Sequence, residues 1–275
     1  NSNIAETVNN AYIIMNSDSL VELCQKPYCN NIEALQCQYG DNFQTVFADS
    51  LINVSENLKK LKALYIGDIY DYEYKTSNVV LTNMSSILEA YPNLELLKVR
   101  GFAYNSDCGL SFTPLLHKNL KTLSIETGYM LCRKIIDQIC ELELPVLEYL
   151  ELWLGNDEYY EPASIFYGND NDDSFNNIEK SALNNLMPII TGKVFPKLKY
   201  LGLRSCNYSN AIAELIVHSP LLDNLKVLDL SMGNLSNEGA EFLLNCPKIN
   251  QLHTLNLSKS ILSSNMIEKL RDNTM

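Results

Sequence analysis

One six-residue pattern, Leu-x-x-Leu-x-Leu, recurs along most of the chain and constrains its fold more than any other feature. Seven copies, some with Ile or Val in the last place, begin at Leu61, Leu94, Leu120, Leu147, Leu198, Leu225 and Leu252, and a degenerate copy begins at Ile32. Four of the seven steps between successive copies are 26 or 27 residues long. Self-similarity at such a period indicates a solenoid of stacked repeats.

Each repeat is expected to contain one strand followed by one helix. The alternation Leu-x-Leu is typical of a short strand with one buried face. The segments 134–140, 211–217 and 238–244 carry apolar residues at spacings of three and four, which predicts helices with one apolar stripe. A proline follows many of these helical segments and ends the helix, because proline lacks an N–H and disfavours helix in the residue before it.

Stacked strand–helix units bury the apolar faces that a single unit leaves exposed. Strands are narrower than helices, so a stack with all strands inside curves into an arc. We therefore predict an α/β leucine-rich-repeat solenoid, a horseshoe of about eight repeats. It has a parallel β-sheet on the concave face and helices on the convex face. Residues 1–31 are expected to form an N-terminal cap, and residues 32–275 the solenoid, with its last helix over 265–272.

The step of 51 residues between Leu147 and Leu198 contains an insertion at 155–177, which reads GNDEYYEPASIFYGNDNDDSFNN. Loops of this length inside compact domains are usually functional or disordered. The mixture of carboxylates with aromatic residues such as Tyr159 and Tyr160 suits a protein-binding loop. A solvated loop and an oxygen-rich cation site are the alternatives, although the EF-hand spacing is absent. A helix is expected to begin after the insertion, near Glu179.

Side chains between the strand leucines are expected to point to the concave face. The central strands carry residue types enriched in binding hot spots, including the single Trp of the chain. The partner-binding set predicted from the sequence consists of Tyr149, Glu151, Trp153, Tyr159, Tyr160, Tyr200, Arg204 and Asp229. The alternative is structural: Trp153 packs against the insertion, and Arg204 forms an ordinary cross-strand ion pair with Glu151.

The composition and the missing motifs argue against several classes of function. The net charge of −12 disfavours nucleic-acid binding, which requires Lys and Arg to neutralise phosphates, and disfavours anionic membrane surfaces. The eight cysteines contain no CxxC pair, and only three histidines are present, so no metal or other cofactor is expected. No phosphate-binding loop, nucleophile elbow or HExxH motif is present, so we do not expect an enzyme.

The segment 195–244 resembles an uncharacterised family of bacterial cytoplasmic leucine-rich-repeat proteins, some of which occur with WGR-type domains. The stretch ELWLGNDEYY at 151–160 is similar to the family's aromatic and acidic insertion. The repeat length resembles that of the ribonuclease-inhibitor-like class of leucine-rich repeats. The resemblance implies a bacterial cytoplasmic protein with an unknown protein partner, and it supplies no catalytic or binding residues.

Three classes of function therefore remain open. The first is a non-enzymatic protein–protein interaction scaffold in the cytoplasm, which we expect to be a monomer. The second is a recognition module of a secreted effector or of a ligase-type complex. The third is an extracellular receptor or adhesin ectodomain, which predicts disulfides among the eight cysteines. Several cysteines fall on apolar faces, where free Cys behaves as a small buried hydrophobe, and this favours the cytoplasmic scaffold.

Overall fold

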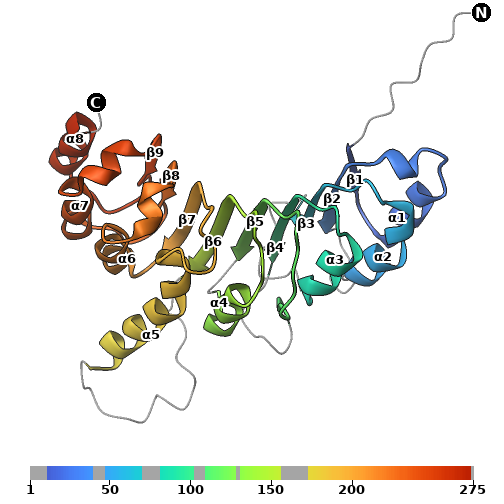
Figure 1. Ribbon diagram of the computed structural model, residues 1–275, viewed down its shortest axis with the longest axis horizontal. Helices are drawn as coiled ribbons and strands as arrows, with labels where there is room; N and C mark the ends of the chain where they lie inside the picture. The colour runs from blue at the N-terminus through green and yellow to red at the C-terminus, as the bar shows by residue number, and fades with distance from the viewer. Residues whose placement is uncertain are drawn as a thin grey trace, which may run out of the picture.

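The computed structural model describes residues 11–39, 47–69, 81–101, 109–127, 131–155 and 173–273. Its core is a nine-stranded, fully parallel sheet in which the strands follow one another in chain order (Figure 1). The strands are β1 (Ala11–Ile14), β2 (Ala34–Tyr39), β3 (Ala63–Ile69), β4 (Leu96–Gly101), β5 (Thr122–Thr127), β6 (Tyr149–Gly155), β7 (Tyr200–Cys206), β8 (Val227–Asp229) and β9 (Thr254–Asn256).

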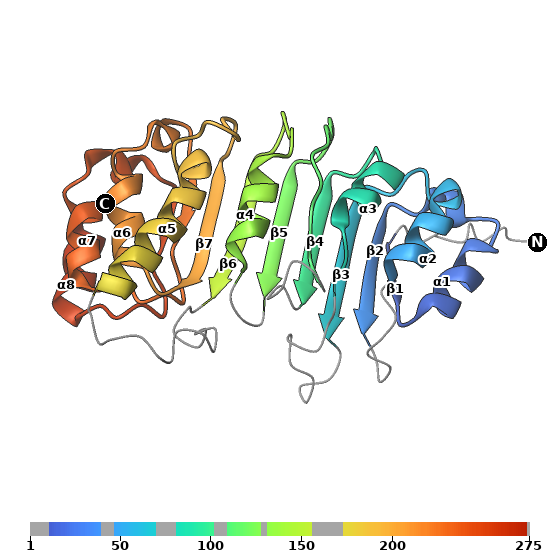
Figure 2. The ribbon, with the colours of Figure 1, turned by 90° about the horizontal axis from the view of Figure 1, so that it is seen from below.

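In the described residues, eight α-helices cover the convex side of the curved sheet and leave its concave side open (Figures 1 and 2). They are α1 (Ser17–Cys24), α2 (Phe47–Asn53), α3 (Met84–Ala90), α4 (Arg133–Cys140), α5 (Asp173–Ile190), α6 (Ser209–Ile216), α7 (Asn237–Leu244) and α8 (Ser264–Asn273). Short 3-10 helices follow at Cys29–Asn31, Ser55–Asn57, Pro220–Asp223 and Pro247–Gln251. The predicted leucine-rich-repeat solenoid is thereby confirmed.

The second leucine of each copy forms a continuous buried column across the sheet. The pairing register sets Leu64 beside Leu97, Leu97 beside Leu123 and so on to Leu228. Each of these side chains is completely buried. Because one face of every strand is packed in this way, a slip of one residue would turn the leucines to the solvent, so the repeat determines the register.

The N-terminal segment contributes a strand–helix unit to the solenoid. Strand β1 pairs in parallel with β2, so that Tyr12 and Ile14 lie beside the buried Leu35 and Cys37. Helix α1 begins after Asn16, whose side chain accepts a hydrogen bond from the Ser19 N–H at 2.8 Å and caps the helix. The segment 1–31, expected as a cap, therefore adds a ninth strand to the eight strand positions expected from the sequence.

The helix after the insertion begins earlier than expected. Helix α5 starts at Asp173 rather than near Glu179, so the last residues of the predicted insertion 155–177 belong to a helix. The other segments predicted as helices, 134–140, 211–217, 238–244 and 265–272, coincide with α4, α6, α7 and α8 to within two residues. Tyr159 and Tyr160 lie outside the described residues.

The repeat between β4 and β5 has no helix in its described part. An extended segment takes its place and forms isolated bridges to both neighbouring repeats, at Ser111 with Asn83 and at Leu116 with Glu143. Figure 2 shows α3 and α4 with strands β4 and β5 between them. Phe112, which is 1% exposed, belongs to the hydrophobic core in this repeat.

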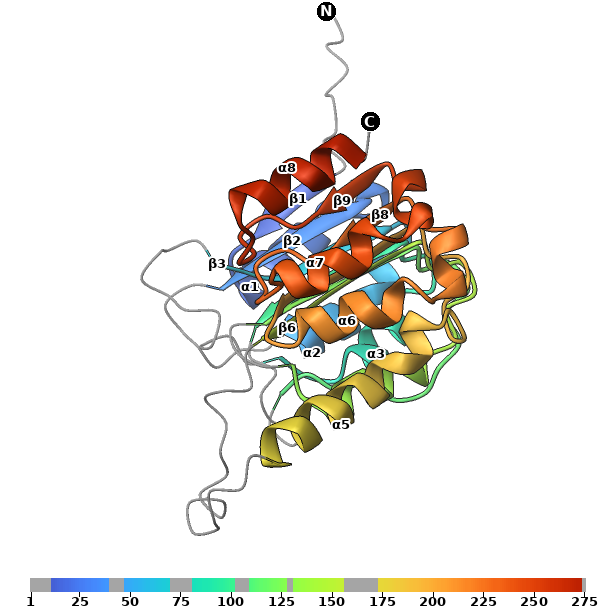
Figure 3. The same cartoon turned by 90° about the vertical axis from the view of Figure 1, so that its left-hand side faces the viewer.

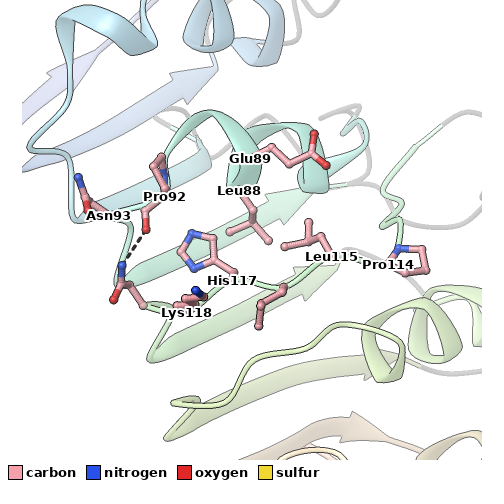
Figure 4. A pocket seen from close by; sticks show the side chains of 10 residues that line it. Leu88, Glu89, Pro92, Asn93, Pro114, Leu115, His117 and Lys118 are labelled. Atoms are coloured by element: carbon pink, nitrogen blue, oxygen red, sulfur yellow. Dashed lines mark hydrogen bonds between the residues drawn. The ribbon is translucent and has the colours of Figure 1, made fainter.

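A pocket of about 510 Å³ lies beside this extended segment (Figure 4). Its inner wall includes His117, which is almost completely buried. The His117 Nδ1 accepts a hydrogen bond from the Leu120 N–H at 3.1 Å, and Nε2 lies 3.1 Å from the Tyr91 carbonyl. These partners select the neutral ring with its proton on Nε2. Burial lowers the pKa of His117, although the hydrogen bond to Tyr91 opposes this effect.

This geometry predicts a pH-dependent loss of stability from His117. A histidine with a lowered pKa in the folded state keeps its full contribution above the unfolded-state value near 6.5 and loses it as the pH falls below that value. Protonated His117 has no acceptor for the Leu120 N–H, which costs about 1 kcal/mol or more. We expect the wild type to lose more stability between pH 7 and pH 5 than His117→Asn, measured by urea unfolding at each pH. Equal losses of stability in the two proteins would contradict this role of His117, because the wild type and His117→Asn contain the same carboxylates.

Candidate functional site on the concave face

The pairing of β6, β7 and β8 brings six of the eight predicted partner-binding residues together. Tyr149 lies opposite Tyr200, and Trp153 lies opposite Arg204. Glu151 and Asp229 lie on either side of Gly202 in the same row. All of these side chains leave the strands on the concave face, because they alternate with the buried leucines. The parallel register therefore makes one cluster from residues that are up to 80 positions apart in the sequence.

Glu151 is the centre of this cluster and is 7% exposed. Its Oε2 accepts hydrogen bonds from the hydroxyls of Tyr149 at 2.8 Å and Tyr200 at 3.0 Å. Its Oε1 accepts from the Trp153 indole N–H at 3.0 Å and the Ser124 hydroxyl at 3.3 Å. A carboxylate has about four acceptor positions, so these four donors from three strands satisfy it.

Three of these donors, together with Arg204, determine the ionisation of Glu151. Burial by itself opposes ionisation and raises the pKa of this carboxyl. Hydrogen bonds from Trp153, Tyr149 and Tyr200, with the nearby Arg204 guanidinium, outweigh burial and lower the pKa below its ordinary value. Glu151 is therefore a saturated, ionised carboxylate that holds the surrounding side chains in place.

The side chains held by Glu151 form two stacked pairs. The rings of Tyr149 and Tyr200 are nearly parallel, with centroids 3.8 Å apart. The Arg204 guanidinium carbon lies 4.5 Å from the centroid of the Trp153 ring. A guanidinium over the face of an indole ring is a favourable cation–π arrangement. The result is a rigid, half-exposed aromatic surface.

Arg204 lies between two buried carboxylates. Its Nη1 is 3.5 Å from Glu151 Oε2, and its Nε is 3.7 Å from Asp229 Oδ2. The Nε–H also donates to the Ser231 hydroxyl at 3.1 Å. The ion pair between Arg204 and Glu151 that the sequence offered as an alternative is present, but it is one part of a larger network. The Arg204 Nη2 donates to Met232 Sδ at 3.4 Å, and the side chain as a whole is 21% exposed.

Asp229 extends the network toward the C-terminal strands. Its Oδ2 accepts from the Tyr200 hydroxyl at 3.1 Å and from the Asn256 amide at 2.9 Å, and its Oδ1 accepts from the Ser231 N–H at 2.9 Å. The single proton of Tyr200 thus serves two carboxylates. Burial raises the pKa of Tyr200, and the Tyr149 hydroxyl and the two carboxylates raise it further, so the phenol stays protonated.

A glycine makes room for this arrangement. A Cβ atom at Gly202 would lie 3.0 Å from the Tyr200 ring and 3.2 Å from Glu151 Cγ. Both side chains close over the Gly202 backbone, which a larger residue would prevent. The alternation of the strand places Gly202 on the concave face, but the sequence does not reveal that a neighbouring ring fills its space.

A second charged group lies on the N-terminal side of the cluster. Glu126 pairs with Arg100, whose Nε is 3.0 Å from Oε1, and with Lys98, whose Nζ is 3.7 Å from Oε2. The Lys98 ammonium also lies 4.8 Å from the centroid of the Tyr65 ring. Aromatic rings, buried carboxylates and partly exposed cations thus lie along the concave face from β3 to β8.

Sequence reasoning did not single out Ser124, Gly202, Ser231 and Asn256, which complete the network. The only sequence feature that points to them is their position, since each lies on the concave face of its strand. Small and amide residues are common on any protein surface, so this position alone does not identify them. Among the described residues, no group of three or more His, Cys, Asp or Glu side chains is arranged to hold a metal ion. No helix in the described ranges is long and apolar enough to cross a membrane.

Comparisons with known proteins support the architecture. No protein-family model and no curated protein matches the sequence. The crystal structure of a Bacteroides fragilis protein from a structural-genomics consortium is similar to this chain, with a TM-score of 0.79 and 26% identity over 98% of this chain and 74% of that one. An internalin from Listeria monocytogenes covers 90% of this chain and 80% of its own length at 15% identity, but its TM-score of 0.33 is too low to support an argument.

Proposed function

We propose that this chain is a non-enzymatic scaffold that binds a protein partner through its concave face, with Tyr149, Trp153, Tyr200 and Arg204 at the centre of the contact. The saturation of Glu151 by four hydrogen-bond donors carries this proposal. Binding is tighter when side chains are held in their bound geometry in advance, because less conformational entropy is lost. Here the carboxylate restrains all the side chains that a partner would contact.

The chemistry of the surface supports a protein partner. Large aromatic side chains and arginine dominate the binding energy of protein interfaces, and here they lie together at the centre of an open concave face. A fully hydrogen-bonded, ionised Glu151 is poorly placed to accept a proton from a substrate, which favours binding over catalysis. The partner is expected to present an apolar group to the Tyr149–Tyr200 pair and a hydrogen-bond acceptor to Arg204.

A bacterial cytoplasmic location belongs to the same proposal. The similarity to a Bacteroides protein supports a bacterial origin. Burial raises the pKa of the Cys37 and Cys140 thiols to about 12, so both stay protonated at neutral pH. Protonated thiols, one buried and one partly buried, suit a reducing compartment.

Replacement of Trp153 tests the concave site. We expect Trp153→Ala to lower the recovery of the partner about tenfold or more in affinity purification from the native cell, because hot-spot aromatics contribute about 2 kcal/mol or more. Mass spectrometry would quantify each recovered protein against the wild type. The half-exposed position of Trp153 allows the change without loss of the leucine core.

A matched control is Phe242→Ala, which removes an exposed aromatic side chain from α7 on the convex side. Proteins that bind the concave site should be retained by Phe242→Ala and lost with Trp153→Ala. If both variants, folded by circular dichroism, recover the same proteins as the wild type, the concave site is not the binding surface.

A further inference from the structure

The charges on the concave face are balanced, although the chain as a whole is acidic. Among the side chains that the structure describes on this face from β3 to β8, three are cationic and three are carboxylates. Their formal charges sum to zero in a chain whose net charge is −12. The six residues are Lys98, Arg100, Glu126, Glu151, Arg204 and Asp229.

The two signs of charge lie at different depths. The three carboxylate side chains are 7–12% exposed, whereas the three cationic side chains are 21–36% exposed. Each carboxylate is thus covered by the cation with which it pairs. Figures 1 and 3 show α5 and α6 on the outer side of the sheet, away from this face. The charge that a partner meets on the concave face from β3 to β8 is therefore positive.

The charges along the N-terminal edge of the same strands do not reverse this sign. Carboxylates and lysines alternate there from repeat to repeat, and both members of each pair are 40–57% exposed, so neither sign dominates. The equivalent residue of the next repeat, Lys226, is also basic. The three ion pairs of this edge are Glu33–Lys62, Glu95–Lys121 and Glu148–Lys199.

The exposed cations form two groups with Trp153 between them. Arg100 and Lys98 lie on β4, and Arg204 lies on β7, opposite Trp153 of β6. Three strand spacings separate β4 from β7, a distance of roughly 14 Å. In an extended peptide, residues two apart point to the same side, and residues four apart are about 13 Å from each other. The spacing of the two groups therefore fits two side chains that are four residues apart in an extended segment.

Both cationic groups keep the capacity to bind a stronger acceptor. The Arg204 Nη1 is 3.5 Å from Glu151 Oε2, and its Nη2 donates to the weakly accepting Met232 sulfur. The Lys98 ammonium has three donors and lies 3.7 Å from Glu126 Oε2, which is longer than a hydrogen bond. A carboxylate of a partner offers both groups shorter, charge-assisted hydrogen bonds.

From these observations we infer that the partner presents an extended acidic segment to the concave face. The segment crosses the strands and places one carboxylate at Lys98 and Arg100, a second carboxylate four residues later at Arg204, and an apolar side chain over Trp153 midway between them. This inference rests on the proposed function and names the chemistry of the partner. A protein segment fits better than a nucleic acid, because the net charge of −12 repels a polymer with a phosphate at every nucleotide.

The fluorescence of Trp153 provides a direct test, since it is the single Trp of the chain. The probe is a synthetic peptide without Trp that carries two glutamates four residues apart and a phenylalanine midway between them. We expect a saturable change in Trp153 emission that weakens as salt is added. The matched peptide with glutamine in place of both glutamates is expected to bind about tenfold more weakly or less, because it lacks the charge-assisted hydrogen bonds.

A pair of lysine variants tests where the acidic segment binds. Lys98→Gln removes a cation of the concave face and leaves Glu126 paired with Arg100, so we expect the fold to be retained and the glutamate peptide to bind about threefold more weakly. Lys121→Gln is the matched control, since it makes the same change of charge at the edge of the sheet. This control is expected to bind the peptide like the wild type. Equal weakening in both variants, folded by circular dichroism, would overturn the inferred site.

Three results with the wild type would also overturn the inference. They are equal binding of the glutamate and glutamine peptides, tighter binding of a lysine peptide or a single-stranded oligonucleotide, and no saturable change with the glutamate peptide up to about 1 mM. The proposed function is tested separately by affinity purification with Trp153→Ala. If that variant loses the partner while the acidic peptide fails to bind, the concave face binds a protein of different chemistry. If that variant retains the partner, the proposed function itself fails.

Discussion

Replacement of Glu151 by alanine is expected to lower the free energy of unfolding by about 3–5 kcal/mol, the loss that follows when one partner of a buried charge network is removed. The variant leaves the Tyr149 and Tyr200 hydroxyls and the Trp153 indole N–H without their acceptor. It also leaves Arg204 with a single carboxylate, Asp229. Urea unfolding followed by circular dichroism measures the loss.

Glu148→Ala is the matched control for this prediction. Glu148 lies three residues earlier and forms an ion pair with Lys199 at 2.7 Å, but both side chains are about half exposed. Exposed ion pairs contribute about 0–1 kcal/mol, so the control is expected to have little effect. Equal losses in the two variants would show that Glu151 is an ordinary surface carboxylate and that the aromatic side chains hold their positions without it.

Replacement of Phe112 by alanine is expected to lower the free energy of unfolding by about 3–5 kcal/mol, as for other buried phenylalanines. Phe112 is 1% exposed and lies in the extended segment that takes the place of a helix. Its N–H donates to the Gln138 side chain at 3.0 Å, so the residue joins this repeat to α4. In the described part of this repeat no helix is present to fill the cavity that alanine leaves.

The Phe112→Ala substitution is also expected to lower the cooperativity of unfolding. Each repeat of a solenoid contacts only its neighbours, so stability is transmitted from repeat to repeat. A weakened junction between α3 and α4 is expected to let the N-terminal repeats unfold before the C-terminal ones, which lowers the denaturant dependence of the transition. Hydrogen exchange would show faster exchange in β2 and β3 than in β7.

Leu116→Ala is the control for Phe112. Leu116 lies in the same segment but is 51% exposed, so little apolar area returns to water when it is truncated. We expect a loss below about 1 kcal/mol and an unchanged transition slope. If Leu116→Ala and Phe112→Ala unfold alike, the extended segment is not part of the core at this junction.

The cluster on the concave face shows how much of a site the repeat pattern predicts. The period of two along each strand identified Tyr149, Trp153, Tyr200 and Arg204 as neighbours on one surface, and the register confirms that they meet. The pattern did not predict that Glu151 would be buried and saturated. Its hydrogen bonding depends on the directions of four side chains from three strands, and no period in the sequence encodes those directions.

The N-terminal unit and the repeat between β4 and β5 show what the repeat pattern did not predict. Strand β1 contains no leucine, and it joins the sheet because Tyr12 and Ile14 continue the buried column of β2. In the described part of the repeat between β4 and β5, an extended segment with the buried Phe112 is found in place of a helix, and both neighbouring repeats bond this segment. The secondary-structure propensities of a short segment do not predict such contacts, because the contacting residues lie one repeat away in the sequence.

The sequence by itself therefore determined the architecture of this protein: a curved parallel sheet, helices on its outer side, and the residues that line its inner face. Leucine spacing is sufficient for this, because burying one face of each strand leaves a single register. Only the tertiary structure decided the ninth strand, the extended segment described between β4 and β5, the early start of α5 and the carboxylate that orders the aromatic surface. Each of these depends on contacts between repeats, where side-chain shape and hydrogen-bond direction, rather than periodicity, select the arrangement.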